Sequence, residues 1–211
     1  MKNGAQGLPV AGIGALSTLD YPGHLALTVF TRGCPWRCAY CHNAALRKGA
    51  GAGDGGWKKV RAMLEERRGF LEAVVFCGGE PTLHEALGAA LRETRDMGFL
   101  NGLHTAGMFP ERLERVLPLL DWVGLDVKAP LDDRYARLTG DPEAAAQVRA
   151  SLSLLRGRGL PTQLRTTVAD TPEGTRMYED VCLQMAEAGF ARPVRQPLWR
   201  VIPSPLEEEC T

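Results

Sequence analysis

The sequence predicts an α/β fold in which parallel strands alternate with helices. Apolar segments with strand-like and helix-like periodicity alternate along most of the 211 residues. Residues that could carry chemistry follow the strand-like segments, and parallel α/β folds place their functional groups at that end of each strand. Hydrophobic residues make up 45% of the chain, which is enough for a globular core. We therefore expect right-handed helical crossovers between the strands.

Six segments are predicted to be strands because each is a short run rich in apolar and β-branched residues. The first is entered through the turn sequence Tyr21-Pro22-Gly23. The predicted strands span residues 24–30, 72–77, 99–104, 122–127, 162–168 and 194–198. No strand is expected earlier, and residues 1–18 are assigned to an N-terminal extension.

Five segments between these strands have helical spacing of their apolar residues. In the first of them Val60, Met63 and Leu64 share one face. The predicted helices span residues 57–68, 83–97, 110–120, 142–157 and 174–188. The Pro- and Glu-rich residues 203–211 are predicted to be a mobile tail, and residues 1–211 to form one domain.

Composition bounds the functions that the chain can have. Its 25 basic residues balance 25 acidic residues, so charge gives no support for binding nucleic acid or a membrane surface. No apolar stretch approaches the roughly 20 residues that span a bilayer, and the N-terminus lacks a signal-peptide pattern. We expect a cytoplasmic protein with reduced thiols, in which Cys77 and Cys182 pack in the core and Cys210 is free.

Cys34, Cys38 and Cys41 form the most informative motif, C-x3-C-x2-C, directly after the first predicted strand. Three thiolates are one fewer than an iron–sulfur cluster or a closed zinc site usually takes from protein. A [4Fe–4S] cluster held in this way has one iron without a protein ligand. Such an open iron can bind a substrate or cofactor, so the motif predicts a reactive cluster.

Two alternatives involve the same cysteines. A structural zinc site could use the three cysteines with His42, although neighbouring side chains such as Cys41 and His42 diverge in an extended chain. A disulfide would need an oxidising compartment, which nothing in the sequence indicates. The sequence favours the cluster, and a zinc-binding interaction module remains an alternative. Trp36 and Arg37 within this loop are predicted to be exposed.

Two further motifs follow predicted strands. Gly78 and Gly79 lack side chains, so their backbone could approach a ligand and accept hydrogen bonds from an ammonium group; a tight turn is the alternative. Asp126 and Lys128 alternate with apolar neighbours and therefore share one face. This pair could bind a charged cofactor or could form an internal salt bridge.

Together these motifs resemble the radical S-adenosylmethionine superfamily. The resemblance includes the cysteine spacing, the aromatic Tyr40, Cys41-His42-Asn43 and Gly78-Gly79-Glu80-Pro81. It implies a partial (β/α)6 barrel, a [4Fe–4S] cluster and S-adenosyl-L-methionine. In that superfamily the open iron chelates the amino and carboxylate groups of the cofactor. Reduction then cleaves the sulfonium to methionine and a 5′-deoxyadenosyl radical.

The resemblance also implies the residues of the site. Cys34, Cys38 and Cys41 would bind the cluster, the cofactor's amino group would lie near Gly78-Gly79-Glu80, and its carboxylate near Lys128. Arg165 stands where the family often has an arginine that contacts the cofactor, although a structural arginine is the alternative. The full set implied for the cofactor is Tyr40, His42, Gly78, Gly79, Glu80, Thr105, Asp126, Lys128 and Arg165.

Within the superfamily, the chain is most similar to the activating proteins of anaerobic ribonucleoside-triphosphate reductase. Asp20-Tyr21-Pro22-Gly23, Asp126-Val127-Lys128-Ala129-Pro130 and Arg165-Thr166-Thr167-Val168 carry this similarity. It implies that the chain installs a glycyl radical on a large partner enzyme, with electrons from a flavodoxin or ferredoxin-type donor. A radical enzyme acting on a small molecule, as the 7-carboxy-7-deazaguanine synthases do, is the alternative.

His104 departs from the pattern of that family. Activating enzymes commonly have an aspartate at this position, where it helps to bind a monovalent cation beside the cofactor. A histidine is a poor ligand for a hard cation, so His104 puts the cation site in doubt, while Thr105 and Asp126 remain. His104 could be protonated and replace the charge of the ion, or could simply pack.

Overall fold

The computed structural model describes residues 4–49 and 56–198, which form a seven-stranded sheet flanked by helices. The strands lie in chain order across the sheet, and β2 to β7 are all parallel. Only β1 is antiparallel, at one edge beside β2. The strands are β1 (Val10–Ser17), β2 (Ala26–Thr31), β3 (Ala73–Gly78), β4 (Leu100–Thr105), β5 (Trp122–Asp126), β6 (Thr162–Val168) and β7 (Val194–Pro197).

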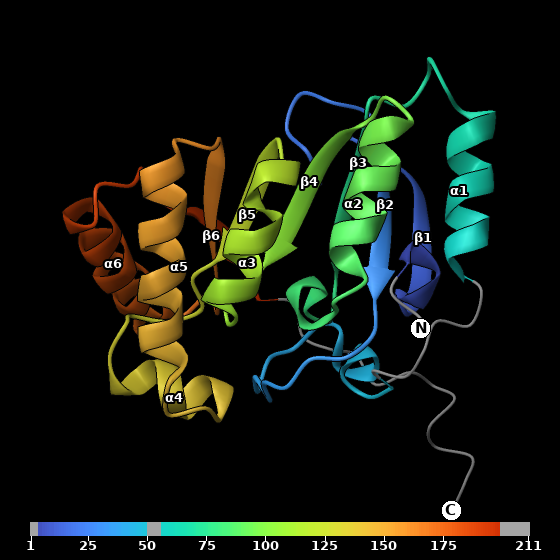
Figure 1. The fold of residues 1–211 in the computed structure, drawn as a ribbon. Coiled ribbons are helices and arrows are strands. Elements are labelled where there is room, and N and C mark those ends of the chain that lie inside the picture. The colour runs from blue at the N-terminus through green and yellow to red at the C-terminus, as the bar shows by residue number, and fades with distance from the viewer. Residues whose placement is uncertain (1–3, 50–55, 199–211) are drawn as a thin grey trace, which may run out of the picture.

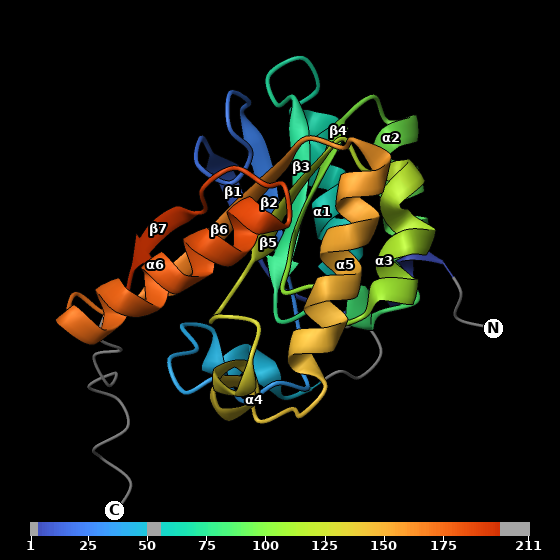
Figure 2. The same ribbon diagram turned by 90° about the vertical axis from the view of Figure 1, so that its left-hand side faces the viewer.

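The helices pack outside the curved sheet, as expected of a partial (β/α)6 barrel. Figures 1 and 2 show α1, α2, α3 and α5 along one face, and α6 packs against β6. The α-helices are α1 (Gly56–Glu66), α2 (Leu87–Asp96), α3 (Pro110–Val116), α4 (Asp133–Thr139), α5 (Ala144–Arg158) and α6 (Pro172–Glu187). Four 3-10 turns accompany them: η1 (Ala5–Gly7), η2 (Ala44–Arg47), η3 (Pro81–Leu83) and η4 (Leu117–Leu119).

The main hydrophobic core lies between the sheet and the helices. Phe76 of β3 and Trp57 of α1 stack with ring centroids 6.1 Å apart, and both side chains are at most 1% exposed. Burial of each such side chain stabilises the fold by about 1.5–3 kcal/mol. Because side chains alternate along a strand, the neighbour Cys77 points to the opposite, inner face of the barrel.

The predicted fold class is confirmed. The six predicted strands correspond to β2–β7, with ends that differ by no more than two residues. Strand β1 is not predicted from the sequence, and it lies inside the N-terminal extension assigned to residues 1–18. Gly12 and Gly14 interrupt the strand-like pattern there, and the strand has two irregularities in its pairing with β2. The single-domain assignment stays a prediction, and residues 203–211 lie outside the described part of the chain.

Two predicted helices are divided in the structure. The segment 83–97 is only partly helical because His84, after η3, has an extended backbone with ψ 124°, and α2 begins at Leu87. The segment 110–120 ends its α-helix at Val116 because Pro118 has no N–H to continue the hydrogen-bond ladder, and η4 follows. The other helices match their predictions closely, and α4 was not predicted. Among the described helices, none has both the length and the apolar character needed to span a bilayer.

Candidate functional site

A cavity of about 450 Å³ opens at the carboxyl ends of the strands, on the side where the cysteine loop crosses below the sheet (Figure 1). All twelve residues that the sequence analysis selected line this one cavity. They come from the cysteine loop and from the exits of β3, β4 and β5, together with one residue of β6. The parallel sheet explains this convergence, because the carboxyl ends of its strands meet at one edge.

The three cysteines of the loop after β2 all line the cavity as free thiols. Cys38 is 8% exposed, while Cys34 and Cys41 are half-buried. Burial raises the pKa of Cys34 to about 11 and also raises that of Cys38, where the positive charge of Lys128 opposes the increase. A positive centre bound among these thiols would favour their thiolate forms.

The donor set fits a [4Fe–4S] cluster in type and position. Within residues 4–49 and 56–198, no three His, Cys, Asp or Glu side chains are gathered around one point as for a single metal ion. In a cluster each thiolate binds its own iron, so the three sulfurs need not converge on one atom. His42, the fourth ligand of the zinc alternative, is exposed at the cavity rim. Cys34, Cys38 and Cys41 are therefore the residues that would hold the cluster.

Gly78 and Gly79 bring the exit of β3 against the exit of β2. Gly78 has a φ of +103°, and a Cβ there would lie 2.6 Å from the backbone of Thr31. A Cβ on Gly79 would lie 2.2 Å from the carbonyl oxygen of Gly33, immediately before Cys34. Both glycines therefore permit a tight turn, as in the alternative, with close backbone contacts, and they also line the cavity.

Glu80 connects two strand exits from a buried position, with 1% of its surface exposed. Its Oε1 accepts hydrogen bonds from the hydroxyls of Thr82 (2.6 Å) and Thr105 (2.7 Å) and from Thr82 N (3.1 Å). Its Oε2 accepts from Ala106 N at 2.9 Å. Burial raises the pKa of Glu80, and the four hydrogen bonds oppose that increase. Glu80 thus holds the β3 and β4 exits together at the cavity wall, and Thr105 contributes its hydroxyl to that link.

Asp126 lies between two cations. Arg165 donates to Asp126 Oδ1 from Nη2 (2.8 Å) and Nε (3.0 Å), and Lys128 Nζ is 3.7 Å from Asp126 Oδ2. Burial alone would raise the pKa of Asp126, but the charges of Arg165 and Lys128 hold it below its usual range. Burial would likewise lower the pKa of Lys128, and Asp126 raises it instead. The internal salt bridge exists, and with one carboxylate for two cations it leaves a net positive charge facing the cavity.

His104 is a neutral packing residue beside this ion pair. Burial and the charge of Arg165 lower its pKa to about 4. Its Nε2 lies 2.6 Å from the carbonyl oxygen of Asp20, so Nε2 carries the proton and donates it. The ring packs against Trp122 with centroids 5.2 Å apart. The structure therefore supports the packing alternative, because the cation next to Asp126 is Arg165.

The buried neutral His104 predicts a pH-dependent stability. An unfolded histidine binds a proton near pH 6.5, whereas the folded one binds it near pH 4, so protons favour the unfolded chain as the pH falls through this interval. We expect His104 to remove on the order of 1–2 kcal/mol of stability between pH 7.5 and 5. Urea unfolding at both pH values measures this loss, which should shrink in His104→Gln and persist in the exposed-site variant His42→Ala. An equal loss in His104→Gln would contradict the assignment.

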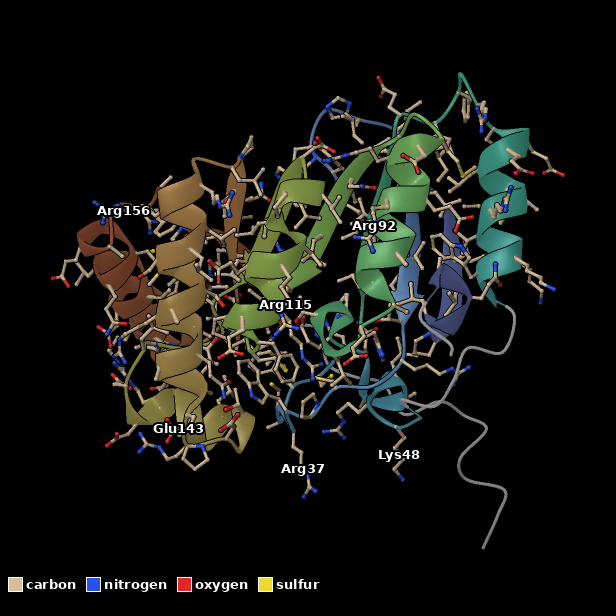
Figure 3. The ribbon with its side chains drawn as sticks, viewed as in Figure 1. Arg37, Lys48, Arg92, Arg115, Glu143 and Arg156 are labelled. Carbon is tan, nitrogen blue, oxygen red and sulfur yellow. The ribbon has the colours of Figure 1, made fainter. Side chains whose placement is uncertain are left out.

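Of the two aromatic residues in the cysteine loop, Trp36 is buried and Tyr40 is half-buried. Trp36 was predicted to be exposed, but it is 2% exposed because its indole N–H donates to Asp141 Oδ2 at 2.9 Å, beyond the unpredicted helix α4. Arg37 does point away from the protein, as predicted (Figure 3). Tyr40 donates to the carbonyl of Lys128 at 3.2 Å, and burial raises its pKa to about 12.

Several cavity residues were not selected from the sequence. Some of them belong to motifs named above, such as Asp20, Asn43 and Thr167, but the sequence assigned them no role at the site. The others come from the cysteine loop and from the strands and their exits. The full set is Asp20, Phe30, Trp36, Asn43, Arg47, Cys77, Ala106, Met108, Thr167 and Gln196, with His104 noted only as a departure.

The family model described as the Radical SAM superfamily matches residues 28–181, which is most of the chain and includes every cavity-lining residue except Asp20 and Gln196. The chain belongs to the radical S-adenosylmethionine superfamily. This membership means that its cofactors are a [4Fe–4S] cluster and S-adenosylmethionine. The three cysteines are therefore assigned to the cluster and not to a structural zinc ion. The roles of individual residues toward these cofactors stay predictions.

Curated relatives support a narrower similarity. The chain is 34% identical over 192 residues to a provisionally named glycyl-radical enzyme activating enzyme of Methanocaldococcus jannaschii, covering 82% of this chain and 73% of that protein. It is 31% identical to the pyruvate formate-lyase-activating enzyme of Clostridium pasteurianum, covering 62% and 57%. It is 32% identical to the 7-carboxy-7-deazaguanine synthase of Thermococcus kodakarensis, covering 52% and 42%. The chain thus spans about half the length of the last two proteins.

Solved structures share the fold at low sequence identity. The structure of TYW1 with a lysine-pyruvate adduct matches with a TM-score of 0.62 at 16% identity, covering 87% of this chain and 69% of that chain. The structure of anSMEcpe with bound AdoMet and a peptide matches with a TM-score of 0.59 at 21% identity, covering 79% and 48%. At these identities the similarity establishes the fold alone.

Proposed function

We propose that this chain is a glycyl-radical enzyme activating enzyme. The observation that carries the proposal is the 34% identity to the archaeal protein of that name across 82% of the chain. The cavity is consistent with it, because the three cysteines of the loop, the glycines Gly78 and Gly79 and a net positive ion-pair group line the same open space. The overall reaction makes the chain an oxidoreductase that acts on another protein.

In this proposal, the residues of the chain bind the cluster and S-adenosylmethionine and orient them for the reaction. A cluster held by Cys34, Cys38 and Cys41 would supply the one-electron reduction of S-adenosylmethionine from which the hydrogen-abstracting radical arises. Carbonyls of Gly78 and Gly79 would accept hydrogen bonds from the cofactor's ammonium group, and Lys128 would attract its carboxylate. The hydrogen atom comes from the α-carbon of a glycine in the partner, so the cavity must admit a protein loop. Positioning is the protein's main contribution to such a reaction.

The partner is proposed to be an anaerobic ribonucleotide reductase, on the sequence similarity described above. The electron donor is proposed to be a flavodoxin or ferredoxin-type protein, and the location the cytoplasm. Cytoplasmic thiols stay reduced, which suits the free cysteines that line the cavity.

Replacing Lys128 with alanine should weaken the binding of S-adenosylmethionine. Lys128 carries a positive charge at the cavity, and its side chain is only 18% exposed. A charge-assisted hydrogen bond in such a position contributes roughly 1.5–3 kcal/mol. Isothermal titration calorimetry of the reconstituted protein measures the affinity, with the exposed Lys58→Ala on α1 as the control. Equal affinities in the two variants would refute the contact.

The function is tested by electron paramagnetic resonance of a mixture. Reduced protein, S-adenosylmethionine and a candidate glycyl-radical enzyme are incubated without oxygen. We expect the doublet signal of a glycyl radical on the partner, and its loss when the target glycine is replaced by alanine. Cofactor cleavage without a protein radical against every candidate partner would reject the proposal.

A small-molecule reaction is the second candidate. The 32% identity to a 7-carboxy-7-deazaguanine synthase favours it, although that match covers only 52% of the chain. Turnover of a small molecule, with the same cofactor cleavage and no protein radical, would select this candidate in the same experiment.

A further inference from the structure

The short helix α4 (Asp133–Thr139) lies between the cysteine loop and the exit of β5, and Figure 2 shows it beside that loop. Tyr135 is at its centre and is 0% exposed. None of the motifs described above includes α4 or Tyr135. The contacts of Tyr135 nevertheless join two separate parts of the candidate site.

The hydroxyl of Tyr135 holds the β5 exit. It accepts a hydrogen bond from Lys128 N at 3.2 Å and donates to the carbonyl of Asp126 at 3.4 Å. The last hydrogen bond from this segment to β6 is donated by Val127 N to the carbonyl of Arg165 at 2.9 Å, and the next N–H, that of Lys128, bonds to Tyr135 instead. The carbonyl of Lys128 accepts from Tyr40 at 3.2 Å. Two tyrosine hydroxyls, one from α4 and one from the cysteine loop, therefore hold the backbone of Lys128.

The same helix holds the cysteine loop. The ring of Trp36 packs edge-on against the ring of Tyr135, with centroids 5.8 Å apart and planes at 70°. Arg37 N donates to the carbonyl of Thr139 at 2.8 Å, and the Thr139 hydroxyl donates to the carbonyl of Tyr135 at 2.9 Å. Trp36 and Arg37 lie between Cys34 and Cys38, so α4 restrains the middle of the motif.

We propose that Tyr135 is a positioning residue, which sets the separation between the cysteine thiols and the Lys128 ammonium group. The rigid side chain of Tyr135 contacts Trp36 of the cysteine loop through its ring and the β5 exit through its hydroxyl. Neither the loop nor the β5 exit can therefore shift without breaking a Tyr135 contact. S-Adenosylmethionine would have to bridge these two parts, since its carboxylate is assigned to Lys128 and its open-iron contact to the cysteine loop. The inference rests on that assignment within the proposed function, and it does not depend on which substrate the radical attacks.

The test compares Tyr135→Phe with Tyr178→Phe. The first variant keeps the ring against Trp36 and removes both hydrogen bonds to the β5 exit. The second is a matched control, because Tyr178 is also buried (6% exposed) and donates to the carbonyl of Pro193 at 2.6 Å, but it lies on α6 and outside the cavity lining. Both variants should lower the urea midpoint to a similar extent.

Only Tyr135→Phe should weaken the binding of S-adenosylmethionine to the cluster-loaded protein, on the order of tenfold by calorimetry. In the cluster-free protein, amide hydrogen exchange of residues 34–41 should become faster in Tyr135→Phe and stay unchanged in Tyr178→Phe. Equal affinities and equal exchange in the two variants would overturn the proposal. Neither measurement requires a glycyl-radical partner, so a failure of the proposed activase function would not contradict the role of Tyr135. A failure of the Tyr135 test would likewise not contradict the activase function.

Discussion

Replacing Cys38 with alanine is expected to abolish the iron–sulfur cluster and, with it, all cleavage of S-adenosylmethionine. Cys38 is the most buried of the three thiols of the cysteine loop and the central ligand of the motif. With two thiolates left, the loop has half the usual number of ligands for a [4Fe–4S] cluster. Anaerobic reconstitution followed by iron analysis and visible absorption measures the loss.

The matched control for that experiment is Cys182→Ala. Cys182 is a half-buried free thiol on α6 and does not line the cavity. The Cys182→Ala variant should bind as much iron as the unmodified protein and should cleave S-adenosylmethionine at the same rate. Unchanged iron content in Cys38→Ala would exclude the predicted ligand set, because the cluster would then have to lie elsewhere.

Replacing Glu80 with alanine is expected to lower the free energy of unfolding by roughly 3–5 kcal/mol, since it leaves buried donors without an acceptor. The hydroxyls of Thr82 and Thr105 and the N–H of Ala106 all donate to this carboxylate. The exits of β3 and β4 would separate, and S-adenosylmethionine should bind more weakly as a consequence. Urea unfolding of the cluster-free protein measures the stability term alone.

Glu80→Gln provides a graded comparison. The amide keeps the shape of the side chain and one acceptor oxygen, but its NH2 group meets a donor on the other side, so the loss should be intermediate. Glu143→Ala, at an exposed position on the protein surface (Figure 3), should be close to neutral. If Glu80→Ala were no less stable than Glu143→Ala, the role of Glu80 in joining the strand exits would be excluded.

The sequence by itself determined the fold class, six of the strands and twelve of the residues that line the cavity. This was possible because the signals are local. Strand periodicity is set by the alternation of neighbouring side chains, and the cysteine motif places three thiols on one short loop. The rule that functional groups follow parallel strands then predicted that Gly78, Thr105 and Lys128 would meet the cysteines, and all of them line one cavity.

Sequence patterns could not predict the role of a residue when its partners in the folded protein are distant in the chain. The sequence shows Glu80 in a glycine-rich turn, but its role depends on Thr105 and Ala106, which the pairing of β3 with β4 brings alongside. His104 could not be assigned a charge from its neighbours in sequence, because burial in the folded chain and the charge of Arg165 on β6 lower its pKa.

The same reason explains why β1 and α4 were missed. Gly12 and Gly14 weaken the strand pattern of β1, which forms because β2 supplies its hydrogen-bond partners. Helix α4 has only seven residues, and isolated helices of that length are unstable in water. Packing of Tyr135 against Trp36 and the Lys128 backbone stabilises it. Only the tertiary structure could decide this, because the stabilising free energy comes from contacts between residues far apart in the chain.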